Sequence, residues 1–372
     1  MKKIVALLLS VLLVCAFCAL AGSSIAAAET EELTPVTLTY STLLGDDRPG
    51  VEGVRMLARK VNEKLGGEYL TVDIYGSNTL GTGATMLDDV LSGVTDIGHI
   101  LVSSHTSRLP LCALFQTPGA ATFLSTESAN CAFTEYLQTL QPSELDGLVV
   151  LYTCANGPGA IVTNFEAHSM DDLKGRQIRC TATTADVLKA WGCNPITLEW
   201  SECYEAMRSH LIEGIYTNTG ACADGTFDDI VDYLIYAPWY NDCEIYAISR
   251  ERFDSLHPAM QQAILEAAAE VQDEFMLTLK DIAVNPFPNI VHFVQSIKGI
   301  IFFPQEEVDR MSDAIAATVA ETKAGELDKK GINGSEALAL IRELADRNNA
   351  IPGYDDSAYK EALFGLGANV LE

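Results

Sequence analysis

The stretch from residue 171 to residue 218 constrains the fold more than any other part of the chain. It reads as a short strand ending at Arg179, a helix around residues 185–191 that Gly192 ends, and a second strand at 196–199. Another helix and another strand follow before residue 218. Strands and helices that alternate over so short a distance predict a mostly parallel sheet covered by helices.

The N-terminal third of the chain shows the same alternation. Strands are expected at residues 36–40, 69–75 and 96–102, with helices at 50–65 and 85–91 between them. The whole chain is therefore expected to be an α/β protein. Removal of the first 28 residues would leave 372 − 28 = 344. Because single cores tend to divide beyond roughly 250 residues, we expect two lobes.

Residues 1–28 have the pattern of a secretory signal peptide. Two lysines precede an apolar run at 4–20, and Ala26-Ala27-Ala28 provides an A-x-A cleavage site. The alternative is a transmembrane anchor, which the small and polar residues from Gly22 onward disfavour. We therefore expect cleavage near Ala28 and a periplasmic protein.

Composition argues against several classes of partner. Lys and Arg number 24 against 51 Asp and Glu, a net charge of −27, which disfavours nucleic acid and anionic membranes as partners.

Two of the 10 cysteines lie in residues 1–28, which leaves 10 − 2 = 8. An exported chain can pair eight cysteines as disulfides in 105 ways, and the pairing stays open. None of the eight forms a C-x-x-C motif, so we expect no metal site and no cofactor.

The sequence lacks the motifs of common enzymes. The patterns G-x-S-x-G, G-x-x-x-x-G-K and H-E-x-x-H do not occur. Adjacent acids such as Asp171-Asp172 and Asp228-Asp229 are typical of helix starts and surface charge rather than of acid–base pairs. We expect a binding protein rather than an enzyme, with a secreted hydrolase as the alternative outside that class.

Four short motifs, in order and at the right spacing, carry a resemblance to a known family. They are Leu-Lys-Gly-x-x-Ile-Arg at 173–179, Gly-x-x-Pro-Ile at 192–196, Trp-Ser-Glu-x-Tyr-x-Ala-Met at 200–207 and Ile-Glu-Gly at 212–214. The stretch resembles the signature region of the solute-binding proteins of tripartite ATP-independent periplasmic (TRAP) transporters, the DctP family. The order of strands and helices extends the resemblance back to about residue 36.

The resemblance implies a two-lobed periplasmic-binding-protein-like fold with a hinge and a long helix that spans both lobes. It implies capture of a small organic acid outside the cytoplasmic membrane. The ligand would be delivered to a permease made of a small and a large integral membrane subunit. We expect the chain itself to be a monomer. Another type of periplasmic binding protein, or a sensor subunit with the same fold, is the alternative within this class.

The chain is expected to cross between the lobes twice, near residues 156–159 and near 233–246. A long helix follows His257-Pro258, and further helices are expected at 304–322 and 335–345. The expected organisation is a signal peptide at 1–28, lobe I at 29–155, lobe II at 156–238, a return to lobe I with the long helix at 239–285, and lobe II with C-terminal helices at 286–372.

Arg179 is the strongest candidate for ligand binding. It ends a strand, and ligands in open α/β sheets bind beyond the carboxyl ends of the strands. A guanidinium there can hold a carboxylate by two parallel hydrogen bonds; the alternative is a surface ion pair. The resemblance assigns the carboxylate clamp to this Arg and an aromatic contact with the ligand to Trp200, for which a core position is the alternative.

The remaining candidates lie at strand ends and crossings. The resemblance implies a pocket-facing Asn that aligns with Thr217, whereas Asn218 is one residue later, so the register of this contact is open. Some family members have a second Arg near Gly159 and this chain has none, which favours a monocarboxylate. The others, each with a structural role as alternative, are Tyr40, Ser41, His99 and Ser103 from lobe I, Asn156 in the first crossing, and an aromatic platform of Trp239 and Tyr240 in the second.

Overall fold

The computed structural model describes residues 32–46, 48–156, 159–218, 227–284 and 288–353, together with 357, 361, 365 and 369–371. The elements below all belong to the unit Pro35–Glu372. The expected signal peptide at residues 1–28 lies outside the described residues, as does Cys222. Within the described part, no helix is both long enough and apolar enough to cross a bilayer.

The first sheet has five strands in the order β2-β1-β3-β10-β4. Strand β1 is parallel to β2 and β3, whereas β10 is antiparallel to β3 and β4. A late segment of the chain therefore inserts between two early strands. The strands are β1 (Val36–Ser41), β2 (Leu70–Tyr75), β3 (Ile97–Leu101), β4 (Leu148–Asn156) and β10 (Asp242–Ser249).

The second sheet has the order β12-β11-β9-β5-β8-β6-β7. Strands β6, β7 and β8 run parallel to one another, and β5 is antiparallel to both β8 and β9. The two sheets confirm the predicted α/β class. The strands are β5 (Gly159–Thr163), β6 (Gln177–Cys180), β7 (Asn194–Thr197), β8 (Gly214–Asn218), β9 (Tyr233–Tyr236), β11 (Gly299–Ile301) and β12 (Val370–Leu371).

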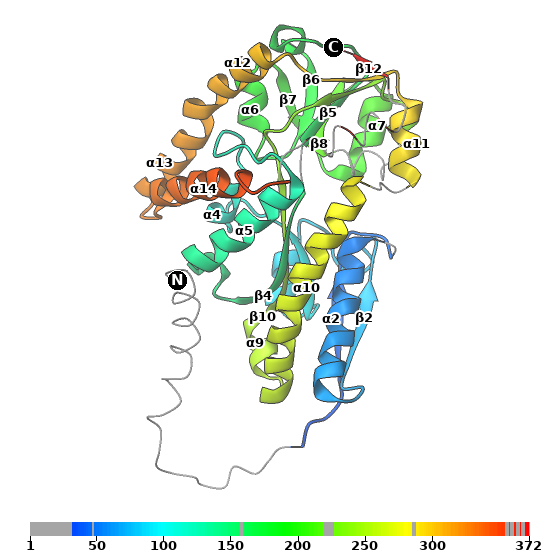
Figure 1. Ribbon diagram of the computed structural model, residues 1–372, viewed down its shortest axis with the longest axis vertical. Coiled ribbons are helices and arrows are strands. Elements are labelled where there is room, and N and C mark those ends of the chain that lie inside the picture. Colours follow the sequence, from blue (N-terminus) through cyan, green and yellow to red (C-terminus); the bar gives the residue numbers. More distant parts are fainter. Residues whose placement is uncertain are drawn as a thin grey trace. The chain divides into compact units, whose positions relative to one another are not determined.

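Helices lie on both sheets and connect their strands (Figure 1). Local sequence explains the ends of the first one, because Pro49 occupies its first turn and Gly66 ends it at φ 72°. The helices are α2 (Pro49–Leu65), α3 (Met86–Leu91), α4 (Pro110–Phe115), α5 (Thr126–Leu140), α6 (Ala185–Ala190), α7 (Cys203–Arg208), α9 (Arg250–Asp254), α10 (Pro258–Val284), α11 (Pro288–Ser296), α12 (Gln305–Ile315), α13 (Glu321–Lys329) and α14 (Gly334–Asn349).

The chain passes between the sheets at the two predicted places. Strand β4 ends at Asn156 in the first sheet and β5 begins at Gly159 in the second. Strand β9 ends at Tyr236 and β10 begins at Asp242, back in the first sheet. The two crossings touch each other: a Cβ at position 159 would lie 2.6 Å from the Ala237 carbonyl oxygen, so only glycine fits there.

The predicted long helix is α10, with 27 residues. It packs along α2 and β4, and Lys60 on α2 lies 2.6 Å from Glu274 and 3.1 Å from Glu270 on α10. After α10 the chain enters α11, whose Phe293 and Val294 belong to a core cluster of the second sheet. Helix α10 therefore carries the chain from the first sheet toward the second, as Figure 1 shows.

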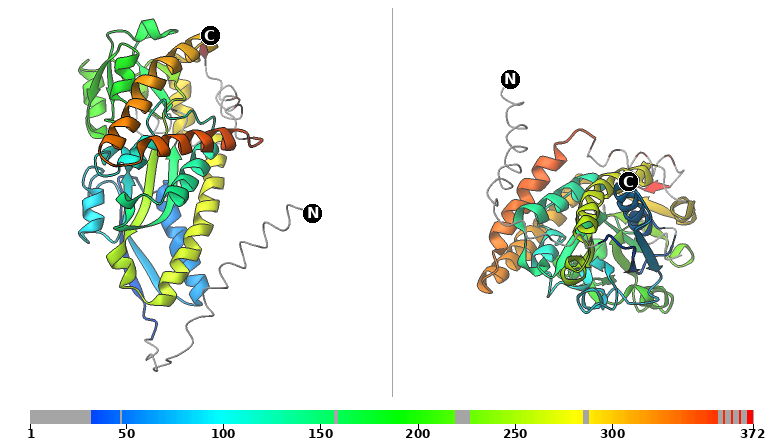
Figure 2. Two further views of the ribbon diagram at one scale, coloured as in Figure 1. Left: turned by 90° about the vertical axis from the view of Figure 1, so that its left-hand side faces the viewer. Right: turned by 90° about the horizontal axis from the view of Figure 1, so that it is seen from below.

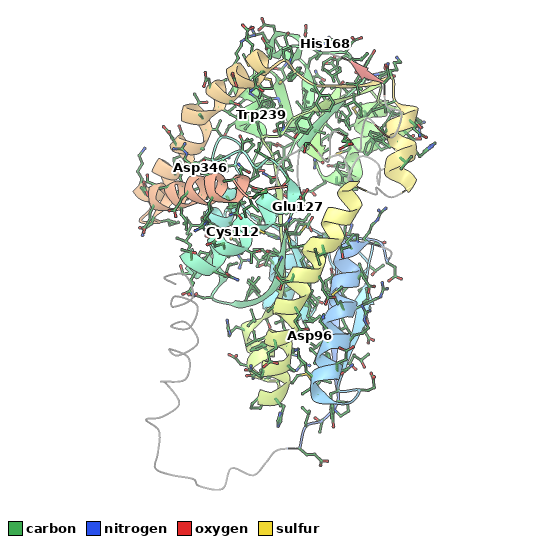
Figure 3. The ribbon with its side chains drawn as sticks, in the orientation of Figure 1. Asp96, Cys112, Glu127, His168, Trp239 and Asp346 are labelled. Atoms are coloured by element: carbon green, nitrogen blue, oxygen red, sulfur yellow. The ribbon has the colours of Figure 1, made fainter. Side chains whose placement is uncertain are left out.

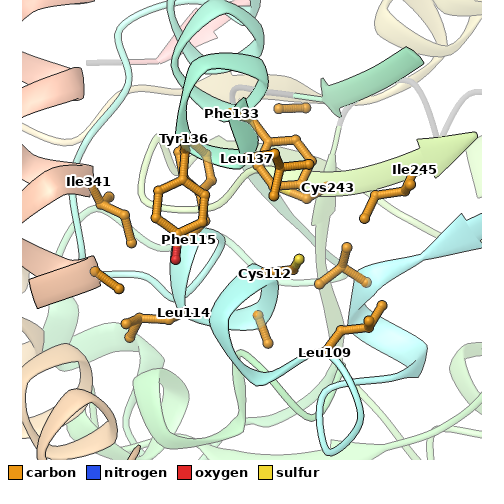
Figure 4. Close-up of a cluster of buried hydrophobic side chains, with 14 of the residues drawn as sticks. Leu109, Cys112, Leu114, Phe115, Phe133, Tyr136, Leu137, Cys243, Ile245 and Ile341 are labelled. Carbon is orange, nitrogen blue, oxygen red and sulfur yellow. The ribbon is translucent and has the colours of Figure 1, made fainter. Parts of the chain in front are cut away.

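The C-terminal helices depart from the expected organisation. The sequence interpretation assigned residues 286–372 to lobe II, but α14 packs against α5 and α4 beside the first sheet. Figure 2 shows α14 and α5 side by side from a second direction, and Figure 4 shows Ile341 in the same buried cluster as Phe115 and Tyr136. Its apolar face, with Ala337, Leu338 and Ile341, explains this packing, which periodicity alone could not direct to one lobe.

The helix expected at 304–322 is present, contains a π-helical segment and extends further, to Lys329. A π-helical segment at Ala316–Ala320 separates α12 from α13. The backbone of Gly119, at φ 89°, packs against this point, where a Cβ would lie 2.9 Å from the Ile315 carbonyl oxygen. Such a widened turn leaves no signal in the hydrophobic period.

Candidate ligand-binding site

Arg179 is held in the second sheet by its neighbours. It lies in β6 between Ile196 of β7 and Ile215 of β8, and only 6% of the residue is exposed. Its Nε donates a hydrogen bond to the Leu198 carbonyl oxygen at 3.0 Å. Its guanidinium carbon lies 5.6 Å from the centre of the Trp200 ring, close enough for a cation–π contact. These contacts fix the orientation of the guanidinium.

This buried guanidinium has no carboxylate partner. Among the described residues, no Asp or Glu oxygen lies within 4.0 Å of Arg179. Arg176, three residues earlier in the chain, shows the ordinary arrangement, because it is partly exposed and its Nη1 lies 2.7 Å from Glu213. An unpaired charge in a buried position costs free energy unless something else neutralises it. The position thus has the properties of an anion-binding site.

Two acids lie at the start of β10, in the strand that follows the second crossing. Asp242 and Glu244 share one face of β10 because side chains alternate along a strand. The Asp242 Oδ1 atom is buried and has no hydrogen-bond partner. Burial, and then the charge of Glu244, raise the pKa of Asp242 to about 6, against the opposing effects of the Tyr240 and Ser103 hydroxyls and of Arg179. The ionised form of the Asp242 carboxyl is therefore less favourable here than in water.

Arg179 of the second sheet and Asp242 of the first are close enough to interact electrostatically. The positive charge of Arg179 lowers the pKa of the Asp242 carboxyl. They nevertheless form no ion pair within 4.0 Å. The Tyr240 hydroxyl lies beside the same carboxyl. The buried guanidinium of Arg179 and the partly buried carboxyl of Asp242 thus belong to different sheets and form no ion pair with each other.

The polar residues deeper in the first sheet are paired with one another. His99 Nδ1 lies 3.0 Å from Thr42 Oγ1, and Tyr246 donates a hydrogen bond to Glu244 Oε2 at 3.0 Å. His99 Nε2 lies 2.9 Å from the same oxygen but forms no hydrogen bond of acceptable geometry. The His99 ring also stacks on Tyr246 with centroids 4.6 Å apart.

The described residues hold no group of three or more His, Cys, Asp or Glu side chains that could bind a metal ion. The seven cysteines that the structure describes form no disulfide with one another. Burial raises the pKa of several of them, including Cys112 and Cys243, which belong to the core cluster drawn in Figure 4. They are small core residues here rather than a disulfide framework.

Comparison with known proteins places this arrangement in a family. The model of the bacterial extracellular solute-binding proteins of family 7, the DctP family, matches residues 40–324. The chain belongs to this family.

Similar proteins include the 2,3-diketo-L-gulonate-binding periplasmic protein of Escherichia coli (strain K12). It is 26% identical over 67% of this chain and 76% of its own length. A TRAP solute-binding protein from a marine metagenome, specific for aromatic acid ligands and crystallised with 3-hydroxybenzoate, has a TM-score of 0.75 at 18% identity; the match covers 85% of this chain and 99% of that one. A pyroglutamic acid-binding receptor of Bordetella pertussis has a TM-score of 0.71 at 20% identity, over 82% and 99% of the two chains.

These comparisons agree with the predicted family and fold. The neighbours are solute-binding proteins of TRAP transporters, not enzymes, and they have the two-lobed form expected from the sequence. In this DctP-family chain the two lobes correspond to the two sheets with their helices, joined by the crossings at 156–159 and 237–241.

The structure brings several predicted site residues of this solute-binding protein together. Arg179 and Trp200 are neighbours, and Ser103 lies beside Asp242, which interacts electrostatically with Arg179. Thr217 lies on the same face of β8 as Ile215, which pairs with Arg179. The side chains of Thr217 and Arg179 are therefore on the same side of the second sheet. Asn156 and Asn218 end β4 and β8, but their side chains lie outside the described part of the structure.

Three residues expected to line the cleft from lobe I, Tyr40, Ser41 and His99, are fully buried in the structure. Tyr40 is fully buried and its hydroxyl points to the carbonyl oxygen of Gly50 at the start of α2. Ser41, also fully buried, lies on the opposite face of β1 from Tyr40, under the turn at Gly81. His99 is enclosed by the contacts with Thr42, Glu244 and Tyr246. Strand-end position alone could not distinguish these faces.

The two aromatic residues of the platform expected in the second crossing are both buried. Trp239 is 3% exposed, donates its Nε1 hydrogen to Ser312 Oγ at 2.7 Å, and packs edge-on against Trp191. Figure 3 labels it among the side chains of the second sheet. Tyr240 is also buried and packs on Tyr216, with its hydroxyl directed to Asp242. The crossing thus uses its aromatic rings to anchor the chain in the second core.

Sequence reasoning missed Asp242 and Glu244. A signal for them exists, because two acids at i and i+2 interrupt the otherwise uncharged run from Ala237 to Ser249. Such alternation puts both carboxylates on one face of a buried strand. The prediction of a crossing between lobes at this stretch takes no account of its two carboxylates.

Proposed function

We propose that this solute-binding protein captures a small organic acid with one carboxylate and delivers it to the small and large membrane subunits of a TRAP transporter. It would act as a monomer in the periplasm, exported by the signal peptide at residues 1–28. In this scheme Arg179 binds the ligand carboxylate and Trp200 packs against the ligand.

The observation that carries the proposal is the buried, unpaired guanidinium of Arg179. Its Nε is occupied by the Leu198 carbonyl oxygen, which orients the two terminal nitrogens. Two parallel N–H groups match the two oxygens of a carboxylate. A ligand carboxylate would therefore supply the partner that the described residues do not provide.

The ligands of related proteins agree with a single carboxylate. The names of similar proteins mention 2,3-diketo-L-gulonate, 3-hydroxybenzoate and pyroglutamic acid, each of which has one carboxylate. In this chain Ala160 and Ile161 follow Gly159, so no second Arg stands beside the first crossing. A second ligand anion would have to approach the acids of β10 instead.

Closure of the lobes follows from the positions of the binding groups. Arg179 and Trp200 belong to the second sheet, whereas Ser103 and Asp242 belong to the first. A ligand that contacts both sets binds a closed form better than an open one and shifts the population toward it. The short crossings at 156–159 and 237–241 would absorb the change in backbone angles.

A thermal-shift screen over carboxylic acids, followed by calorimetry, tests the proposal. Ligand at 100 times Kd should add roughly 2.7 kcal/mol of stability to the folded protein. Arg179→Ala should weaken binding of the hits by roughly 2–5 kcal/mol, because a buried carboxylate loses its partner. Arg176→Ala, an exposed change in the same part of the chain, serves as the matched control and should leave affinity nearly unchanged.

Arg179→Lys sharpens the test. It keeps the positive charge but loses the bidentate geometry, so it too should bind more weakly than the wild-type protein. If both Arg179 variants bind the hits with wild-type affinity, the carboxylate is held elsewhere and the proposed role of Arg179 is wrong. A clear preference for dicarboxylates over monocarboxylates of similar size would contradict the proposed ligand class.

A further inference from the structure

We propose that the ligand also carries a positively charged amino group, which Asp242 binds while Arg179 binds the carboxylate. This inference rests on the proposed function and narrows the ligand to amino acids and compounds of the same zwitterionic type.

The first argument is the arrangement of opposite charges. Arg179, from the second sheet, and Asp242, from the first, interact electrostatically but form no ion pair within 4.0 Å. Arg179 is 6% exposed, and the Oδ1 atom of Asp242 is buried without a hydrogen-bond partner. A zwitterion placed between them presents a negative group to the Arg and a positive group to the Asp. A plain organic acid would satisfy only the first.

The second argument is the excess of negative charge around Asp242. Glu244, two residues along the same face of β10, makes the ionised form of Asp242 less favourable. Glu244 itself is in contact with Tyr246 and His99, whereas no such ion partner contacts Asp242. A plain carboxylate entering this region would meet an unneutralised acid. An ammonium group removes that repulsion, because it brings the missing positive charge.

The third argument concerns hydrogen bonds. An ammonium group has three N–H donors and needs three acceptors. Asp242 is accompanied by the hydroxyls of Ser103 and Tyr240, both of which interact with its carboxyl. One carboxylate and two hydroxyls can accept from one ammonium group. A metal ion is the less suitable occupant, since the described residues hold no group of three acidic, His or Cys side chains around a common point.

The Asp242 carboxyl also gives the inference a pH signature. Burial raises its pKa to about 6, so part of the ligand-free protein carries a proton there near that pH. Binding of an ammonium group favours the ionised carboxylate and so expels that proton. Affinity for an amino acid should therefore fall as the pH drops below about 6, while affinity for an acid without the amino group should not.

Matched ligand pairs test the proposal by calorimetry at pH 7.5 and pH 5.5. The pairs are L-phenylalanine with 3-phenylpropionate, L-leucine with 4-methylpentanoate, and L-proline with cyclopentanecarboxylate. The proteins are the wild type, Asp242→Asn, Arg179→Ala, and Asp73→Asn as a control on the exposed face of β2. In the wild type the amino member of a pair should bind at least about 30-fold more tightly, and Asp242→Asn should remove most of that advantage.

The outcomes separate the two proposals. If the acids without an amino group bind as tightly as their partners and Asp242→Asn changes neither, the amino-group inference is wrong while the organic-acid function stands. If no member of any pair binds the wild type, or Arg179→Ala has no effect on those that do, the organic-acid function itself fails. If binding of the plain acids becomes tight only on addition of Na⁺ or Ca²⁺, and Asp242→Asn abolishes this effect, Asp242 holds an inorganic cation and the inference is overturned.

Discussion

Two buried groups, Glu244 in the first sheet and Arg179 in the second, differ in their partners. In the first sheet Thr42, His99, Glu244 and Tyr246 contact one another, and their charges and hydrogen bonds are used within the protein. In the second sheet Arg179 is equally buried but meets no carboxylate among the described residues. A satisfied buried network stabilises and specifies a fold, whereas an unsatisfied buried charge marks a place for something that the chain itself does not supply.

The largest expected effect comes from breaking the satisfied network. His99→Leu should lower the free energy of unfolding by about 3–5 kcal/mol, because Glu244 would keep a buried charge with fewer partners. Urea denaturation measures this. His168→Leu is the control: His168 also lies beside a carboxylate, Glu166, but in a half-exposed position, so its loss should cost less than about 1 kcal/mol. Equal effects of the two changes would show that the network at His99 does not stabilise the first sheet.

The sequence predicts the fold far better than it predicts the faces of the strands. Alternating strands and helices, the two crossings and the long helix follow from periodicity and from the breaks at Gly159 and Pro238. Arg179 is predicted as a ligand-binding residue because a charged residue at the end of a strand within a motif is a local signal. The burial of Ser41 and Trp239 could not be predicted in the same way, because a strand-end position does not say which side of the sheet a side chain occupies.

Other features depend on contacts that are distant in sequence. The packing of α14 against α5 joins segments about two hundred residues apart, and nothing in the pattern of α14 names its partner. The electrostatic interaction of Arg179 with Asp242 joins strands of different sheets that are far apart in the sequence. Charge in an apolar strand could have been noticed from the sequence, but the interaction between these two opposite charges could not.

Asp242 provides a second test of the comparison, because it belongs to the first sheet but interacts electrostatically with Arg179 of the second. Burial raises its pKa from 3.8 to about 6, so the folded protein holds the proton to higher pH than the unfolded chain does. The contribution of this group to stability is complete below pH 3.8 and is lost as the pH rises through about 6. Asp242→Asn should therefore increase the free energy of unfolding at pH 7–8 by about 1–3 kcal/mol, and the gain should disappear below about pH 4.

Denaturation of the variant and the wild type across this pH range checks the prediction without ligand. Asp171→Asn provides a control of opposite sign, because Lys174 and then Arg310 lower the pKa of Asp171. That change should decrease stability at pH 7, not increase it. If Asp242→Asn is less stable than the wild type at pH 7–8, the Asp242 carboxyl has a partner in solution that neutralises it, and the contrast with the first sheet would shrink.

The smallest expected effect is optical and concerns the second region alone. Trp191 and Trp239 are buried, and their indole nitrogens donate to Met311 and Ser312, whereas Trp200 is only partly buried and lies beside Arg179. A ligand that binds Arg179 should therefore change the fluorescence of Trp200 and leave the other two nearly constant.

Trp200→Phe should remove most of the ligand-dependent signal, while Trp239→Phe should keep it. X-ray scattering of the Trp200→Phe protein with saturating ligand should still show a smaller radius of gyration, because closure depends on contacts from both sheets. A signal that survives in Trp200→Phe but vanishes in Trp239→Phe would mean that binding reorganises the buried core of the second sheet rather than filling the space beside Arg179.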